Sequence, residues 1–227
     1  MTVLFDYPKK AHFGRVLPKT KIYEHAGPSS AMKELFVRQV EQITWAYKLA
    51  PETINVPATQ AVREIQVFDI TLKTGDLKED VLRCIDKAIP FPIIFEMSHA
   101  GKCRAIAAYK RQNEADSEKW VVSSYFGTDW LPQDMPRKTI PITLNLGGLY
   151  EELLGALIPY PPRAGESFQA RVERAESIRR QQQELAKTED RLSKEIQFNR
   201  KVEINAEIRT MQQQLATLTR SDTQGKS

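Results

Sequence analysis

Residues 64–97 read EIQVFDITLKTGDLKEDVLRCIDKAIPFPIIFEM, and this stretch sets the fold class of the chain. Residues 64–73 are rich in β-branched and aromatic side chains, which favour strands. Apolar residues fall on both faces of this strand, so we expect it to be central and covered on both sides. Residues 77–89 have apolar residues at helical spacing, and residues 93–97 are apolar again. A strand, a helix and a strand in this order predict a parallel pair joined by a helical crossover.

More strands and helices are expected outward from this stretch. Residues 103–109 and 119–126 have strand composition and follow short connections, so hairpins add antiparallel partners and the sheet is mixed. Upstream, serines precede a helical pattern over residues 30–50, which ends before a proline. Downstream, residues 147–158 predict a further helix. We therefore expect an α/β (α+β) domain with a mixed sheet flanked by helices.

The chain divides by composition into four parts. Residues 1–28 are basic and contain three prolines, which predicts a basic extended arm. Residues 29–162 form the α/β domain, and residues 163–220 form a long helix or a helical hairpin. Residues 221–227 are expected to be a disordered tail.

Residues 166–220 contain no Gly or Pro and consist mostly of good helix formers. Five apolar residues recur there at spacings of 4, 3, 4 and 3, which is typical of a coiled-coil seam. We name them the C-terminal seam: Ile204, Ile208, Met211, Leu215 and Leu218. The heptad register breaks around residues 197–201, which permits a stutter or a bend. A seam needs a covering helix, which the chain itself supplies if it folds as a hairpin, or which another chain supplies. We predict that these five residues bind a partner protein or a second copy of the chain in a homodimer, and a fold-back within the chain stays open.

Composition excludes several classes of protein. The chain has 227 residues, of which 41% are hydrophobic and 27% charged, so it is not disordered throughout. Its net charge of +4 permits a nucleic-acid partner without requiring one. Its two cysteines, Cys84 and Cys103, form no disulfide framework. No apolar run has the length of a membrane span or signal peptide, so we expect a cytoplasmic protein that contacts no membrane.

No enzyme motif is complete in this sequence. Asp69 and Glu96 suit the strands of a metal-dependent nuclease, but Thr71 and Ser98 stand where that site needs a lysine. Nucleophile-elbow and phosphate-loop patterns are absent, and the three histidines lack metal-ligand spacing. We therefore assign no catalytic residue, cofactor or metal site. A divergent metal-dependent nuclease using this acidic pair remains an alternative.

Several cations accompany aromatic residues in the strand-rich region, as on nucleic-acid-binding sheets. Strand aromatics also pack cores, and hairpin lysines also protect sheet edges, so both interpretations stay open. The residues expected to bind nucleic acid are Lys9, Lys10, Arg15, Lys19, Lys21, Lys102, Arg104, Lys110, Arg111 and Lys119.

Five stretches resemble one known family. They are ELFVRQVEQITWAYKLAPET (34–53), IQVFDITLK (65–73), IDKAIPFPII (85–94), LGGLYEELLGAL (146–157) and KEIQFNRKVEINAEIR (194–209). Together they resemble the bacterial domain-of-unknown-function family 4391, over nearly the whole chain. The last stretch is the most specific, because coiled-coil packing does not require it.

This resemblance implies no activity and no catalytic residues. It does imply a genomic position beside a DNA methyltransferase and a DEAD/DEAH-type helicase, similar to restriction-modification and other phage-defence clusters. We therefore expect a non-catalytic accessory subunit of a DNA-acting defence complex. Its partners would be the helicase or methyltransferase subunits and DNA. A structural oligomerisation protein without DNA contact is a further alternative.

Overall fold

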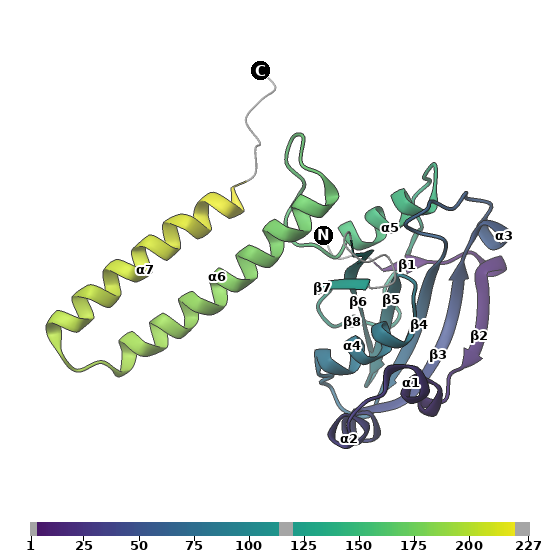
Figure 1. Ribbon diagram of the computed structural model, residues 1–227, viewed down its shortest axis with the longest axis horizontal. Helices are drawn as coiled ribbons and strands as arrows, with labels where there is room; N and C mark the ends of the chain where they lie inside the picture. Colours follow the sequence, from purple (N-terminus) through teal and green to yellow (C-terminus); the bar gives the residue numbers. More distant parts are fainter. Residues whose placement is uncertain (1–3, 114–119, 221–227) are drawn as a thin grey trace. The chain divides into compact units, whose positions relative to one another are not determined.

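The computed structural model describes residues 4–113 and 120–220. The chain separates into two compact units, Met1–Leu157 and Ile158–Ser227. The first unit contains the sheet, and the second contains the two longest helices, α6 and α7 (Figure 1). The expected disordered tail over residues 221–227 lies outside the described residues.

The first unit is built on a seven-stranded mixed sheet with the order β2-β3-β4-β5-β6-β7, in which β8 also pairs with β6. Its strands are β2 (His12–Val16), β3 (Val40–Leu49), β4 (Ile65–Leu72), β5 (Ile93–His99), β6 (Lys102–Gln112), β7 (Trp120–Gly127) and β8 (Leu131–Pro132). Strands β4 and β5 are parallel and are joined through helix α4 (Glu79–Ala88), whereas the other neighbours are antiparallel. The predicted mixed sheet is confirmed.

Three helices cover one face of this sheet: α1 (Lys19–Ala26), α2 (Ser30–Gln39) and α4 (Figure 1). A continuous buried core lies between helices and strands, with Phe36, Phe68 and Phe95 among its largest members. Burying one such side chain stabilises the fold by about 1.5–3 kcal/mol. This layer therefore supplies much of the stability of the first unit.

The predicted helix over residues 30–50 is wrong in its second half, because α2 ends at Gln39 and β3 follows directly. The start is as predicted: the Ser29 hydroxyl accepts a hydrogen bond from the backbone N–H of Met32 at 3.3 Å. In β3 the buried residues recur at every third position. The reason is that pairing with β4 shifts register twice, and each irregularity changes which side chains face inward. A bulged strand can thus imitate helical spacing.

Residues 4–28, the described part of the expected extended arm, also differ from that expectation. They form β1 (Phe5–Asp6), the 3-10 helix η1 (Lys9–Ala11), β2 and α1. Pro8 and Pro18 occupy the N-cap positions of η1 and α1, so these prolines precede helices and do not interrupt them. Gly27 then ends α1 with a left-handed φ of 59°, which glycine adopts without strain.

The opposite face of the sheet is partly covered by α5 (Leu146–Gly155). The ring of Tyr150 stacks on Tyr109, with 6.1 Å between ring centroids. The Tyr150 hydroxyl donates to the carbonyl oxygen of Ala108 at 2.7 Å and accepts from the backbone N–H of Lys110 at 2.9 Å. The helix predicted over residues 147–158 is therefore present with slightly earlier bounds. A short helix α3 (Pro51–Ile54) and a parallel pair of β1 with β9 (Lys138–Thr139) complete this unit.

The second unit is a helical hairpin of α6 (Phe168–Lys194) and α7 (Phe198–Thr219) (Figure 1). The connection occupies residues 195–197, at the start of the predicted register break. The Glu195 carboxylate accepts hydrogen bonds from the backbone N–H groups of Ile196 at 2.8 Å and Gln197 at 2.9 Å. At the other end, the Arg163 guanidinium donates to the carbonyl oxygen of Leu218 at 2.8 Å and so caps the C-terminus of α7. Of the two predicted forms, the hairpin is the one observed.

Candidate functional site

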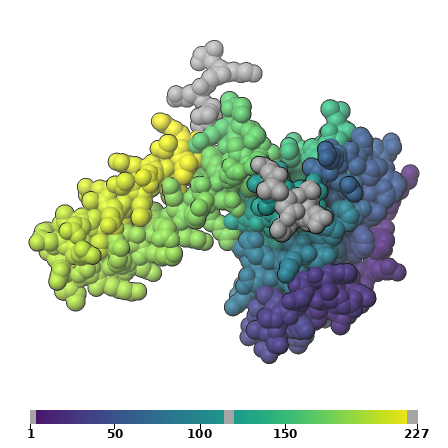
Figure 2. Space-filling model, in the orientation of Figure 1, coloured from purple at the N-terminus to yellow at the C-terminus, as the bar shows by residue number. Residues whose placement is uncertain are grey.

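The C-terminal seam closes the inside of the hairpin. Ile204 is 3% exposed and Ile208 is 8% exposed, and Figure 2 shows the side chains of the two helices meeting along the hairpin. Met211, Leu215 and Leu218 are half-buried. Arg191 of α6 also forms an ion pair with Glu207 of α7. Ile204 and Ile208 are therefore not available to a partner, because α6 supplies the covering helix that their spacing requires.

The hairpin exposes apolar side chains at its turn instead. Ile196 is 90% exposed, Phe198 is 78% exposed and Val202 is 54% exposed. We name residues 195–202 the hairpin tip. Its two cations, Arg200 and Lys201, are also exposed. An exposed apolar cluster bordered by charge is typical of a protein–protein contact site.

Sequence reasoning did not assign this tip. The exposed residues lie within the stretch KEIQFNRKVEINAEIR. This stretch is the most specific part of the family resemblance, because coiled-coil packing does not require it. The available signal was that Phe198 and Val202 fall outside the seam spacing. Their exposure depends on where α6 ends and the turn begins. The sequence predicted the position of this turn only approximately.

The ten predicted nucleic-acid-binding residues do not form one surface. Lys9, Lys10, Arg15, Lys21 and Lys102 are exposed, while Lys119 lies outside the described residues. Arg15 is on the edge strand β2, and Lys102 is on β6, four positions along the sheet order. At about 4.8 Å per strand this separation is about 19 Å. Lys9, Lys10, Arg15 and Lys21 belong to η1, β2 and α1. These four exposed cations are close to one another in the sequence, unlike Lys102.

Three other members of this set make contacts within the protein. The Lys19 ammonium donates to the carbonyl oxygen of Val40 at 2.5 Å, at the end of α2. The Arg104 guanidinium lies 5.7 Å from the centroid of the Trp130 ring. Arg111 is half-buried and donates to the carbonyl oxygen of Gln112 at 3.5 Å. Tyr125 and Phe126, two aromatic residues of the same strand-rich region, are buried in the sheet. These contacts favour a structural role.

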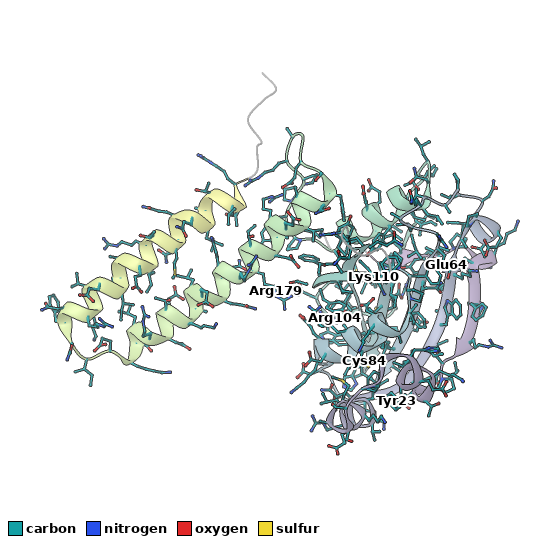
Figure 3. All side chains as sticks on the ribbon, in the orientation of Figure 1. Tyr23, Glu64, Cys84, Arg104, Lys110 and Arg179 are labelled. Atoms are coloured by element: carbon teal, nitrogen blue, oxygen red, sulfur yellow. The ribbon has the colours of Figure 1, made fainter. Side chains whose placement is uncertain are left out.

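Lys110 is in the interior, which corrects its assignment to nucleic acid (Figure 3). Its ammonium lies 3.5 Å from a carboxylate oxygen of Asp86 and donates to the carbonyl oxygens of Asp86 and Ile89 at the end of α4. The Tyr125 hydroxyl donates to the same carboxylate. Burial lowers the pKa of Lys110 and raises the pKa of Asp86, while each charge opposes the shift of the other. A buried cation held in this way cannot contact a phosphate.

Asp69 and Glu96 lie side by side on the parallel strands β4 and β5, on the same face of the sheet. The Arg137 guanidinium donates to Glu96 Oε1 at 2.9 Å and to the carbonyl oxygen of Phe5 at 3.0 Å. Burial raises the pKa of Glu96, and the positive charge of Arg137 opposes this shift. Within residues 4–113 and 120–220, no group of three or more His, Cys, Asp or Glu residues could hold a metal ion. The geometry thus supports a clamp that ties the β1 and β9 pair to the sheet.

This arrangement defines the class of protein: a mixed α/β unit with an appended helical hairpin. The family model described as "Domain of unknown function (DUF4391)" matches residues 5–215, and the chain belongs to this family. The family suggested by the sequence is therefore confirmed. No curated protein matches the chain, and no solved structure matches it. In the described part of the chain, no helix is long and apolar enough to cross a membrane.

Proposed function

We propose that this protein is a non-catalytic accessory subunit of a DNA-acting bacterial defence complex and docks on its partner through the hairpin tip. The observation that carries the proposal is the exposure of Ile196, Phe198 and Val202 on a hairpin that already buries Ile204 and Ile208. The gene neighbourhood implied by the family resemblance supports a helicase or DNA methyltransferase as the partner.

The chemistry of the tip suits a protein partner. Aromatic side chains are enriched among the residues that supply most of the contact energy at the centre of interfaces, and polar residues form the rim. Phe198 is such an anchor, with Arg200 and Lys201 two and three residues further along the chain. Because Glu195 fixes the linker backbone, the tip loses little conformational freedom when it binds.

DNA is the second proposed partner, contacted by Lys9, Lys10, Arg15 and Lys21 of the N-terminal elements. Contacts of this kind are made to phosphates and carry no sequence information. Binding would therefore weaken steeply as the salt concentration rises, since phosphate neutralisation releases counterions. A structural protein without DNA contact would lack this salt dependence.

The test is a capture experiment with tagged full-length protein in the native host. The wild type is compared with the double variant Ile196→Asp, Phe198→Asp, and captured proteins are identified by mass spectrometry. Val37→Asp is the matched control, because Val37 is an exposed apolar residue of α2 in the first unit. We expect a helicase or methyltransferase with the wild type and the control, and its loss with the tip variant. Undiminished capture by the tip variant, or capture of a second copy of this chain alone, would contradict the proposal.

A further inference from the structure

The first unit contains a pocket with a volume of about 580 Å³, whose lining includes Arg15 and Lys21 of the proposed DNA-contacting cations. It lies on the helix-covered face of the sheet, between β2, β3 and β4, the helix α1 and the end of α4. Trp45, Phe68 and Phe91 contribute aromatic walls. The rings of Trp45 and Phe68 are nearly parallel, with an angle of 25° and 6.1 Å between centroids. A pocket of this size and lining suits a flat ligand of the size of a small cofactor.

One buried polar group in the pocket wall lacks a partner. Gln66 lines the pocket and is 1% exposed. Its side-chain amide donates to the Glu64 carboxylate, so its carbonyl oxygen is the end that points elsewhere. That oxygen has no hydrogen-bond partner among the described residues. A buried acceptor without a donor is costly, and a ligand that carries an N–H or O–H group and reaches this oxygen would remove that cost.

A chain of ionic contacts fixes the orientation of Gln66. The Lys48 ammonium lies 3.1 Å from Glu64 Oε2 and 2.8 Å from Glu52 Oε1. Glu64, labelled in Figure 3, is thereby held at the start of β4 with its other oxygen on the amide of Gln66. A carboxylate accepts and cannot donate, so the amide cannot turn over without placing two acceptors together. The acceptor of Gln66 is therefore set in place before any ligand arrives.

The rim of the pocket is cationic. Arg15 and Lys21 line it together with His25, and all three are exposed. Lys21 is paired with Glu24 at 2.8 Å on the surface, where such pairs contribute little. An anion at the rim can therefore replace Glu24. By contrast, an anion at the inner end of the pocket would lie beside the Glu64 carboxylate and the Gln66 oxygen, which would repel it.

We propose that this pocket binds a nucleotide. The base lies among Trp45, Phe68 and Phe91 and donates a hydrogen bond to the Gln66 oxygen, while the phosphate contacts Arg15 and Lys21. A nucleotide combines these features: the base is a flat ring that carries a hydrogen-bond donor, and the phosphate carries the negative charge. The ligand is either a free nucleotide or an unstacked nucleotide within a single strand, since both present the same chemistry. The proposal shares Arg15 and Lys21 with the proposed DNA contact and is independent of docking by the hairpin tip.

The test is calorimetric titration of the full-length protein at low salt with AMP, GMP, CMP and UMP. Ribose 5-phosphate is the probe without a base, and a mixed-sequence single-stranded oligonucleotide represents the second source. We expect Gln66→Leu, and separately the double variant Arg15→Gln, Lys21→Gln, to weaken binding by about tenfold or more. Lys102→Gln is the matched control, an exposed cation on β6 that does not line the pocket. Binding of the oligonucleotide alone, with the same pattern of variants, assigns the site to a nucleotide within a strand.

Three results would overturn the assignment. One is that no probe binds; another is that ribose 5-phosphate binds as tightly as the nucleotides. The third is that the pocket variants bind like the wild type. If Gln66→Leu does not fold, the exposed rim variant and the comparison of AMP with ribose 5-phosphate decide the question. The tip variant Phe198→Asp is expected to keep nucleotide binding, which separates failure of this site from failure of the docking proposal.

Discussion

The α/β unit and the helical hairpin bury their apolar side chains in different ways. In the first unit, strands and helices enclose a core, and even the buried charges of Lys110 and Asp86 have partners. The hairpin has a single interface between two helices, which covers Ile204 and Ile208 but cannot cover residues at the turn. The comparison teaches that a two-helix unit buries its seam but leaves the apolar residues at its turn exposed to water.

Replacing a core aromatic residue should have the largest effect on stability. Phe95 is fully buried in the central strand β5. Phe95→Ala should lower the free energy of unfolding by about 4 kcal/mol, because a buried ring is lost and a cavity remains. Urea unfolding followed by tryptophan fluorescence reports on this unit, since Trp45, Trp120 and Trp130 all belong to it. A loss below about 1 kcal/mol would show that the unit is not closely packed there.

Removing the buried cation should have the next largest effect. Lys110→Met should cost about 3 kcal/mol at neutral pH, because Asp86 would be left as a buried charge without its partner. The pKa of Asp86 is already raised by burial, and it rises further when Lys110 is removed. A carboxyl whose folded pKa is raised stabilises the protein less as pH increases from the unfolded pKa toward the folded one.

The deficit of Lys110→Met should therefore be smaller at pH 5 than at pH 8. Urea unfolding of variant and wild type at both pH values measures it. Lys102→Met is the control, since this exposed lysine lies on the same strand. A deficit that is equal at both pH values would contradict the account of a buried charge pair.

The seam of the hairpin should show an intermediate effect. Ile208→Ala should destabilise the hairpin by about 2 kcal/mol, at the low end for buried isoleucine, because only two helices surround it. Thermal unfolding followed by circular dichroism at 222 nm measures the loss of helix. Phe198→Ala is the matched control in the same helix. An equal loss of stability in both variants would mean that Ile208 contributes no more to the stability of the hairpin than Phe198 does.

The tip itself should show the smallest effect on stability. Ile196→Asp with Phe198→Asp should change the free energy of unfolding by less than about 0.5 kcal/mol, because both side chains are already in water. Thermal unfolding of the tip variant and the wild type, followed by circular dichroism at 222 nm, measures this change in stability. A large destabilisation would show that these residues are buried by the chain itself, and the tip would no longer be a docking surface.

The sequence predicted the parts of the fold that depend on local pattern. Residues 64–97 form the strand, helix and parallel strand that were expected, and Ser29 caps α2 as its position indicated. The strand β3 was missed because its bulges produce helical spacing. The structure of residues 4–28 was missed because prolines at N-cap positions resemble prolines that prevent a helix.

The candidate sites were less predictable because they depend on tertiary arrangement. Charge alone selected Lys110, and only the structure places Asp86 beside it. The seam spacing was informative, but the choice between a partner and α6 depended on the turn at residues 195–197. Gln66 carries no sequence signal of a pocket, since it lies within an apolar strand and its unpaired oxygen is a property of its neighbours.

Amide hydrogen exchange on the free full-length protein and on its captured complex tests the central claim most directly. It reports on every described backbone segment at once. We predict new protection across residues 195–202 in the complex, with the core strand β5 unchanged. Protection confined to other segments, with the tip exchanging as fast as in the free protein, would contradict docking through the hairpin tip.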